Sequence, residues 1–148
     1  MEKQPAAALV LELLEAVWNR GDTAVVDRLV AADYIEHGTD GPEIGRQHVS
    51  QDAETYRSAF PDLRMIFDEP IAEGDRVATR FTAMGTQLAP MAGLPATGKS
   101  ARVSGIWIHR VVDGRITESW VTWDNLGLLR QLGFVQPERL ESATGVVQ

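Results

Sequence analysis

Hydrophobic positions in the first half of the chain recur with the spacing of amphipathic helices. The first stripe ends at Gly21, a typical helix stop, and predicts a long N-terminal helix. Shorter stripes predict a second helix over 22–30 and a third over 49–60, which Pro61 ends. Between these two, DYIEHG is expected to form a short strand or turn that leads into the loop HGTDGPEIG. The stripe of the first helix comprises Leu9, Val10, Leu13, Leu14, Val17 and Trp18.

From Leu63 onward the apolar positions alternate with period two, which is typical of strands. The alternation predicts two hairpins, and Asp113-Gly114 is a strong turn signal for the second one. Pro70 indicates an edge or a bulge in the first hairpin. The loop LAPMAGLPATGKS separates the hairpins, at a place where binding loops are often found. The predicted strands cover 63–72, 75–87, 101–112 and 115–123.

A short helix over 125–133 and a flexible tail over 135–148 are expected to complete the chain. Helices come first and strands afterwards, whereas a parallel doubly wound sheet would need the two to alternate. The sequence therefore predicts a single α+β domain over 1–148, with a curved sheet folded over helices.

Composition and charge narrow the range of partners. The 148 residues carry a formal net charge of -7, which disfavours binding to nucleic acid or to an anionic membrane surface. Glu12 and Glu15 interrupt the apolar N-terminal segment, so it is interpreted as a helix of the mature protein. No apolar run approaches the ~20 residues that span a bilayer. The sequence contains no cysteine, which suits the cytoplasm.

The second hairpin predicts one wall of a pocket. Strand alternation and pairing outward from the turn place Trp107 and His109 near Trp120 and Glu118 on a common face. Such a mixture of indoles, an imidazole and carboxylates is typical of a small-molecule site, with a partly buried oligomer interface as the other interpretation. On the last strand, the residues expected on this face are Trp120, Thr122 and Asp124.

Asp124 is the first candidate for catalysis, because a carboxylate in a dry pocket gains proton affinity and can transfer protons near neutral pH. The competing interpretation is an N-cap of the helix that follows. His109 is a candidate for orienting Asp124 or polarising a substrate carbonyl, unless it is a buried structural histidine. His37 is a candidate at the mouth of the pocket, unless it is merely solvated, and His48 is expected on the surface.

Several other chemistries lack their motifs. The histidines have no HxH or HExxH spacing, so no metal site is predicted. GxSxG, P-loop and Rossmann glycine patterns are missing, which disfavours acyl-enzyme chemistry, nucleotide hydrolysis and dinucleotide binding. No cofactor is expected.

Several short motifs follow one another along the chain: NRGD, DYIEHG, FPDL, EGDRVATRFTAMGT, GLPATGKS, HRVVDGRITESW and WDNLGLLRQLG. Their order and spacing resemble those of the SnoaL-like polyketide cyclases, or ester cyclases, of the nuclear-transport-factor-2-like superfamily. The resemblance implies a cone-shaped barrel in which a bent, mostly antiparallel sheet wraps three helices around a cavity, usually in a homodimer or homotetramer. It also implies cofactor-free ring closure by intramolecular aldol condensation, with Asp124 as acid and base.

The same resemblance suggests which residues bind a polyketide-like substrate. Many relatives read GTH where this chain has Gly85-Thr86-Gln87, which places Gln87 near the expected cavity. Some cyclases carry a histidine where Trp107 stands. The candidate substrate-binding residues are Trp18, Gln87, Trp107, Trp120 and Thr122.

Two other functions remain open at this point. Relatives on this fold hydrolyse epoxides or isomerise double bonds in small apolar molecules with buried carboxylates. Epoxide opening would need Asp124 with a second inward acid and an arginine, for which Glu118 and Arg80 are available. A non-catalytic module that binds a small molecule is the third hypothesis, since a fold alone does not fix a function.

Overall fold

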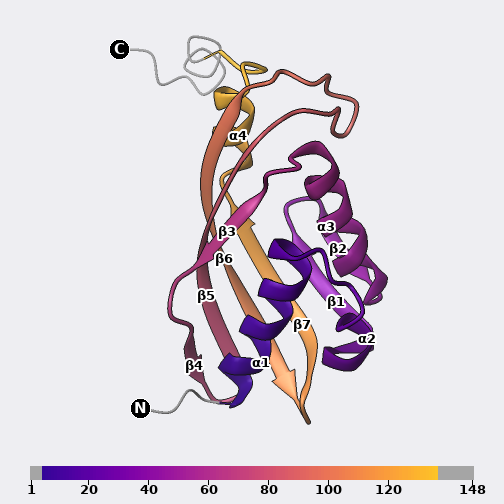
Figure 1. Ribbon diagram of the computed structural model, residues 1–148. Coiled ribbons are helices and arrows are strands. Elements are labelled where there is room, and N and C mark those ends of the chain that lie inside the picture. Colours follow the sequence, from indigo (N-terminus) through magenta and orange to yellow (C-terminus); the bar gives the residue numbers. More distant parts are fainter. Residues whose placement is uncertain (1–4, 137–148) are drawn as a thin grey trace.

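The computed structural model describes residues 5–136 and contains a seven-stranded, strongly curved sheet with helices on its concave side (Figure 1). The predicted α+β class is confirmed. The expected tail over 135–148 lies, beyond its first two residues, outside the described range. The elements are α1 (Pro5–Leu14), η1 (Glu15–Asn19), α2 (Val26–Leu29), β1 (Val30–Gly38), β2 (Gly41–Ile44), α3 (Gln47–Ala59), β3 (Arg64–Phe67), β4 (Ile71–Glu73), β5 (Arg76–Thr86), β6 (Ser100–Val112), β7 (Arg115–Trp123) and α4 (Asn125–Gln131).

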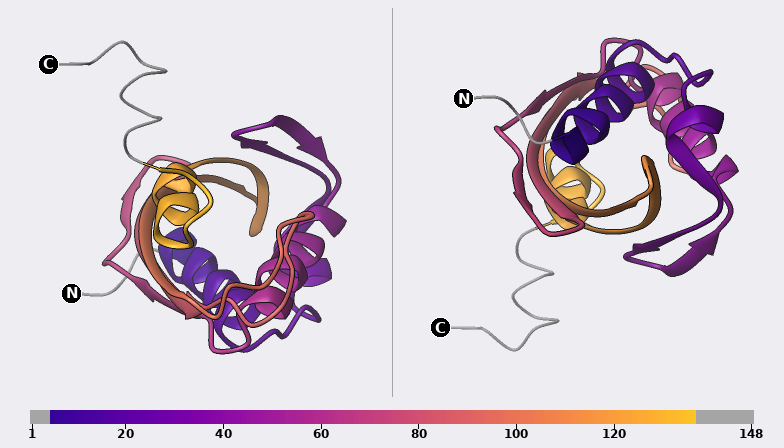
Figure 2. Two further views of the ribbon diagram at one scale, coloured as in Figure 1. Left: turned by 90° about the horizontal axis from the view of Figure 1, so that it is seen from above. Right: turned by 90° about the horizontal axis from the view of Figure 1, so that it is seen from below.

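The sheet has the strand order β2-β1-β7-β6-β5-β3, and β4 also pairs with β5. All neighbours are antiparallel except β1 and β7, which run parallel. The predicted strand over 63–72 is divided into β3 and β4 on either side of Pro70, as expected for an edge with a proline. Seen along its length, the sheet curls most of the way around α1 (Figure 2).

The core lies between α1 and the concave face of the sheet. The predicted stripe of α1 is confirmed, because Val10, Leu13 and Leu14 are buried with the inward side chains Val77 and Ile116 of the sheet. After Leu14 the helix widens into the π-helical turn η1, a local irregularity that is frequent at functional sites. No helix within residues 5–136 has both the length and the apolar character to cross a bilayer.

The segment before α3 differs from the prediction. Only Val26–Leu29 are helical in the region expected to hold the second helix, and the chain then continues as the nine-residue strand β1. The predicted loop contains β2, whose Ile44 pairs with Ile35 of β1. Pairing with β2 on one side and β7 on the other supplies backbone hydrogen bonds that no local sequence signal reveals.

A bulge in β7 reverses the predicted facing of that strand. Val111 pairs with Ile116, but the preceding residue Arg110 pairs with Glu118, so Thr117 is an extra residue. Because strand side chains alternate between faces, one extra residue moves every later side chain to the opposite face. The prediction that Glu118, Trp120 and Thr122 share the inner face with Trp107 and His109 is therefore wrong. The inner face of β7 instead carries Ser119, Val121 and Trp123.

Candidate active site

A pocket of about 230 Å³ lies between the concave face of the sheet, η1 and α3. Its walls are mainly apolar, as is usual for small-molecule sites. The volume is below the roughly 300–1,000 Å³ of typical ligand pockets, so a large polycyclic ligand would have to extend out of the mouth. The aromatic side chains of the lining are Trp18, Tyr56, Phe60, Phe81, Trp107 and Trp123.

Trp107 of β6 lies at the centre of this aromatic wall. Its ring centroid is 4.5 Å from that of Phe81 and 5.7 Å from that of Trp18. Gly105, two residues earlier on the same face, permits the close packing, since a Cβ atom there would lie 2.5 Å from Trp123 Cβ and 2.6 Å from Phe81 Cζ. Trp18 and Trp107, two of the candidate substrate-binding residues, both line the pocket, and their binding of a substrate stays a prediction.

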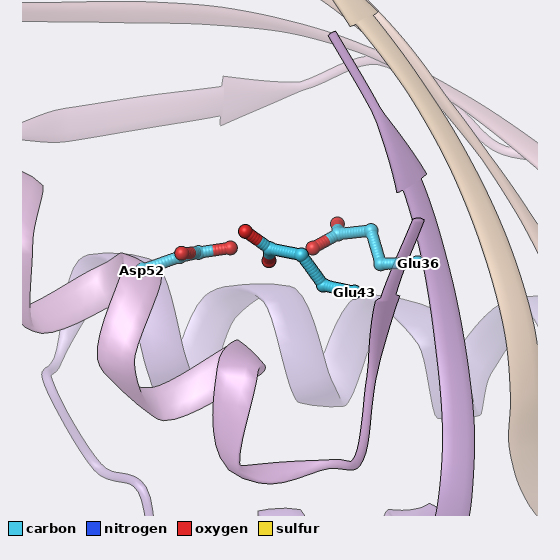
Figure 3. A group of neighbouring side chains, drawn as sticks. All are labelled: Glu36, Glu43 and Asp52. Carbon is cyan, nitrogen blue, oxygen red and sulfur yellow. The ribbon is translucent and has the colours of Figure 1, made fainter. Parts of the chain in front are cut away.

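Three carboxylates face one another at the other side of the pocket (Figure 3). Glu36 comes from β1, Glu43 from β2 and Asp52 from α3, and one carboxylate oxygen of each lies within 4.8 Å of those of the other two. Partial burial, with the negative charges of Glu36 and Glu43, raises the pKa of Asp52 to about 7. Burial also raises the pKa of Glu36, and the hydrogen bond from Trp107 opposes that rise.

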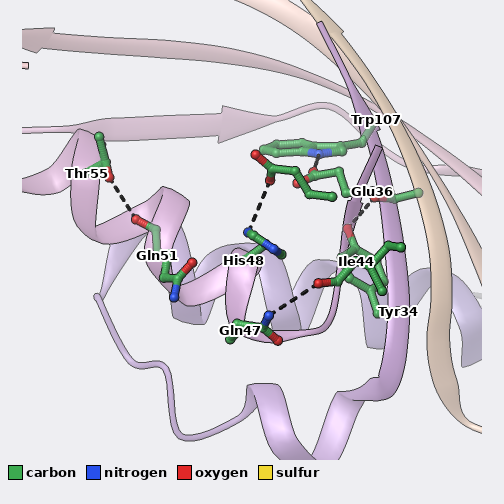
Figure 4. Close-up of polar contacts among 10 residues, drawn as sticks. Tyr34, Glu36, Ile44, Gln47, His48, Gln51, Thr55 and Trp107 are labelled. Carbon is green, nitrogen blue, oxygen red and sulfur yellow. Dashed lines mark hydrogen bonds and ion pairs between the residues drawn. The ribbon is translucent and has the colours of Figure 1, made fainter. Parts of the chain in front are cut away.

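The three carboxylates of the cluster have different polar neighbours (Figure 4). Trp107 Nε1–H donates to Glu36 Oε1 over 3.3 Å. His48 Nδ1 lies 3.6 Å from Glu43 Oε2, at the more exposed side. The buried Tyr34 hydroxyl bonds to Ser119 Oγ, and its pKa is raised by burial and by the nearby charge of Glu36. One or two protons shared within the cluster would relieve the repulsion.

The same three carboxylates are the one group of histidine and acidic side chains within residues 5–136 that is compact enough to share a cation. Oxygen ligands of this kind suit Mg²⁺ or Ca²⁺. The sequence gives no metal motif, and a shared proton accounts for the same geometry. The absence of a metal therefore stays a prediction.

Asp124 does not face the pocket. It is exposed and is the N-cap of α4, where its Oδ1 accepts a 2.8 Å hydrogen bond from the amide of Gly127. The expectation that Asp124 lies desolvated among indoles is wrong, because the bulge in β7 turns this position away from the pocket. The capping interpretation is confirmed. Its sequence neighbour Trp123, and Leu128 in α4, do line the pocket, so Asp124 lies close to one end of it.

His109 is buried but is not part of the pocket lining. Its ring lies 6.0 Å from that of Trp107, and its Nδ1 has no hydrogen-bond partner among the described residues. Burial lowers the pKa of His109 to about 3, so the ring is neutral at physiological pH. His109 does not orient Asp124. The backbone amide of Asp124 donates to the carbonyl of Ser104, which lies five residues before His109 on β6. The structural interpretation of His109 holds.

His37 and Trp120 meet on the convex face of the sheet. Their rings stack with centroids 5.4 Å apart, and His37 Nε2 lies 2.6 Å from Glu118 Oε2. Arg76 covers the Trp120 ring at 4.8 Å. The bulge in β7 turns Trp120 outward, and β1 in register with it carries His37 to the same side. His37, Trp120 and the exposed Thr122 therefore lie outside the lining of this pocket, contrary to the positions expected from the sequence.

Gln87 is fully buried but is used within the loop that follows β5. Its Nε2 donates to the carbonyl of Pro95, and its Oε1 accepts from the Thr97 hydroxyl. Its backbone bonds to Lys99 and Gly98. The side chain thus has its polar atoms satisfied within the loop, and Gln87 lies outside the pocket lining, contrary to its expected place near the cavity.

The carboxylates of the pocket were missed by sequence reasoning, although two signals were present. Glu36 lies in the motif DYIEHG, and strand alternation would have placed it on the same face as Tyr34 had the nine-residue strand been recognised. Asp52 lies one helical turn before Tyr56, within the apolar stripe of α3, where an acid is out of place.

Solved structures and sequence relatives place the chain in a known class. TsrD from Streptomyces laurentii matches with a TM-score of 0.80 and 29% identity, over 91% of this chain and 100% of that one. AclR from Streptomyces galilaeus, a candidate hydroxylase, matches with a TM-score of 0.78 and 30% identity, over 88% and 97%. The fold is thus the nuclear-transport-factor-2-like cone that the sequence predicted.

The sequence relatives agree with this class. An aklanonic acid methyl ester cyclase from Streptomyces sp. (strain C5) is 30% identical over 141 residues, which cover 87% of this chain and 82% of the relative. A nogalonic acid methyl ester cyclase from Streptomyces nogalater is 30% identical over 128 residues, covering 83% and 94%. The model of the SnoaL-like polyketide cyclase family matches residues 8–132. The chain belongs to this family.

Proposed function

We propose that the protein closes a ring in a polyketide-like ester by an intramolecular aldol-type reaction, with carboxylates as the proton-transfer groups. One observation carries the proposal: Glu36 and Asp52, with raised proton affinity, face each other in a pocket whose walls are mainly apolar. A carboxylate whose pKa lies near the working pH can both take and return a proton. The names of the relatives, which are methyl ester cyclases, support the same reaction class.

The chemistry needs proton transfer and orientation but no redox step. Ionised Glu36 removes a proton from a carbon flanked by two carbonyls, and the resulting enolate carbon attacks a carbonyl of the same molecule. One carbon–carbon bond forms, and the attacked oxygen receives a proton from Asp52. The product is an isomer of the substrate. Trp18, Trp107 and Phe81 would hold a flat chain in a folded, reactive conformer.

The charges of the pocket favour a neutral substrate. Its lining within the described residues contains four acids, Glu36, Asp40, Glu43 and Asp52, and no lysine, arginine or histidine. A free carboxylate on the ligand would be repelled by these groups and would find no cation. An ester in the same position carries no charge. The pocket is therefore suited to an esterified substrate and not to the corresponding acid.

Asp124 is the competing candidate for the proton-transfer group, as the family resemblance implies. Its side chain is exposed and caps α4, although it lies close to one end of the pocket. The Glu36 and Asp52 pair lies inside the pocket, where burial raises the proton affinity of both acids. We therefore place the proton transfer on this pair.

The epoxide hydrolase alternative has less support. Arg80 lies on the convex side and forms an ion pair with Asp68 at 3.3 Å, and Glu118 bonds to His37 on the same side. Neither residue belongs to the lining of the pocket. The arginine and the second acid that epoxide opening requires are therefore not brought together with Asp124.

Incubation with aklanonic acid methyl ester, followed by chromatography and mass spectrometry, tests the proposal. The expected product has the mass of the substrate and a new retention time, and the free acid is a poor substrate. A mass gain of one oxygen would indicate hydroxylation and contradict ring closure. The assay is repeated with EDTA, where an unchanged rate is expected because no step uses a metal.

Self-association is also proposed, through the convex face of the sheet. Ile66, Ile71 and Ile106 are exposed on the three strands that pair with β5, and Ile71 is 74% exposed. An apolar face of this kind is typical of a surface that another subunit covers. Ile106→Glu is expected to yield a monomer in size-exclusion chromatography with light scattering, against a dimer or tetramer for the wild type. Location in the cytoplasm stays a prediction from the sequence.

A further inference from the structure

Trp107 is held in one orientation by its neighbours. The indole is 5% exposed and packs against the rings of Phe81, Trp18 and His109. This packing directs the ring N–H at Glu36 Oε1, 3.3 Å away (Figure 4). An indole nitrogen donates and never accepts a hydrogen bond, so its partner oxygen must supply a lone pair. The contact therefore favours the ionised form of Glu36 over a form protonated at that oxygen.

We propose that Trp107 is a positioning residue whose N–H keeps Glu36 ionised and leaves the shared proton of the pair on Asp52. The inference rests on the proposed function, in which this pair moves the substrate's proton. It adds a division of roles: Glu36 is the base that attacks the substrate carbon, and Asp52 is the acid that protonates the new oxygen.

The other groups around the pair do not supply this asymmetry. Glu43 of β2 repels negative charge on both acids and so raises the pKa of each. His48 of α3 favours ionised Asp52 when it is protonated, but it lies on the side of Glu43. The Tyr34 hydroxyl forms its hydrogen bond with the Ser119 hydroxyl and not with either acid of the pair. The described contacts give Glu36 a fixed N–H donor and give Asp52 no hydrogen bond except that with Glu36.

The remaining titratable groups near the pair are tyrosine and aspartate side chains. Tyr56 follows Asp52 by one turn of α3, and its pKa is raised by burial and by the charges of Asp52 and Asp40. It therefore stays neutral across the range in which the acids titrate. Asp40 lies at the exposed part of the lining, and the pKa shifts of Glu36 and Asp52 arise from burial and from groups other than Asp40.

The test is a carboxyl-carbon NMR titration of protein labelled at glutamate and aspartate, without substrate. In the wild type, Glu36 is expected to ionise at a lower pH than Asp52. The indole N–H signal of Trp107 is expected to move with the midpoint of Glu36. In Trp107→Phe, which keeps an aromatic ring but loses the donor, the Glu36 midpoint is expected to rise by roughly one pH unit.

Trp123→Phe is the matched control. It removes an indole from the same lining, but Trp123 donates no hydrogen bond to the pair. Its Glu36 midpoint is expected to stay at the wild-type value. An unchanged midpoint in Trp107→Phe, or an equal rise in both variants, would overturn the proposal.

The wild-type measurements decide the case even if Trp107→Phe does not fold. Two results would overturn the role of Trp107: ionisation of Asp52 at a lower pH than Glu36, or an indole N–H signal that does not shift at the Glu36 midpoint. Because the titration uses no substrate, this failure is distinct from failure of the proposed function. The latter would appear as full turnover in Glu36→Gln and Asp52→Asn.

Discussion

Glu36 and Asp52 come from different elements, β1 and α3, yet their carboxylate oxygens lie within 4.8 Å of each other in the pocket. Partial burial raises the pKa of both acids, and the negative charge of Glu36 raises that of Asp52 further. The pair is therefore expected to hold one proton at neutral pH and to titrate in two coupled steps. Such a pair can take a proton from carbon and return one to oxygen without any cofactor.

The pH dependence of turnover follows from this arrangement. Ring closure requires ionised Glu36 and protonated Asp52, so kcat is expected to fall as pH rises through about 7, where Asp52 loses its proton. It is also expected to fall at low pH, as Glu36 becomes protonated. Initial rates from pH 4 to 9 with the ester substrate give the profile. A rate that is flat from pH 6 to 9 would contradict the role of Asp52.

Asp124 is expected to stabilise the protein through its cap of α4. Asp124→Ala removes the acceptor for the Gly127 amide and should lower the free energy of unfolding by about 1 kcal/mol. Asp124→Asn keeps an acceptor and should lower it less. Urea unfolding of the three proteins measures the difference. Equal stability of all three would contradict a capping role.

His109 is expected to weaken the fold in acid. The folded protein resists protonation of this ring until about pH 3, whereas the unfolded chain takes up the proton near pH 6.5. Between these values the unfolded state binds more protons, so stability falls as pH falls, by up to about 1.4 kcal/mol per pH unit. His109→Leu should show a flatter dependence in urea unfolding from pH 6.5 to 4. Parallel curves for the two proteins would contradict the assignment.

Gln87 is expected to hold the loop between β5 and β6 in place. Gln87→Ala leaves the carbonyl of Pro95 and the hydroxyl of Thr97 without their partner, which should cost about 1–3 kcal/mol of stability. Faster hydrogen exchange is expected across residues 88–99, with Gln51→Ala, an exposed glutamine on α3, as the control. A raised KM with unchanged exchange would instead favour contact with substrate.

Much of the fold could be predicted because it rests on local patterns. The apolar stripe that includes Val10 and Leu14 predicted α1, and Asp113-Gly114 predicted the turn between β6 and β7. The inward facing of Trp107 and His109 also followed from alternation along β6. These features depend on residues close in sequence, and the spacing of the apolar residues among them indicates which side of the element is buried.

The site could be predicted only in part, because it depends on contacts between distant segments. No residue type near Thr117 signals a bulge in the sequence, yet the bulge determines which face of β7 lines the pocket. β1 owes its full length to pairing with β7, and the alternation that places Glu36 on the same face as Tyr34 can be read only once that nine-residue strand is known. Asp52 acquires its raised pKa only when α3 packs over that strand.

Turnover of the ester by carboxamide variants, followed in D₂O so that proton abstraction from carbon is also seen, tests the central claim most directly. Glu36→Gln and Asp52→Asn should each lose roughly 10²–10⁴-fold in kcat. Asp124→Asn, and Glu54→Gln on the exposed side of α3, should stay near the wild type. Full turnover in the two pocket variants, with collapse in Asp124→Asn, would contradict the claim.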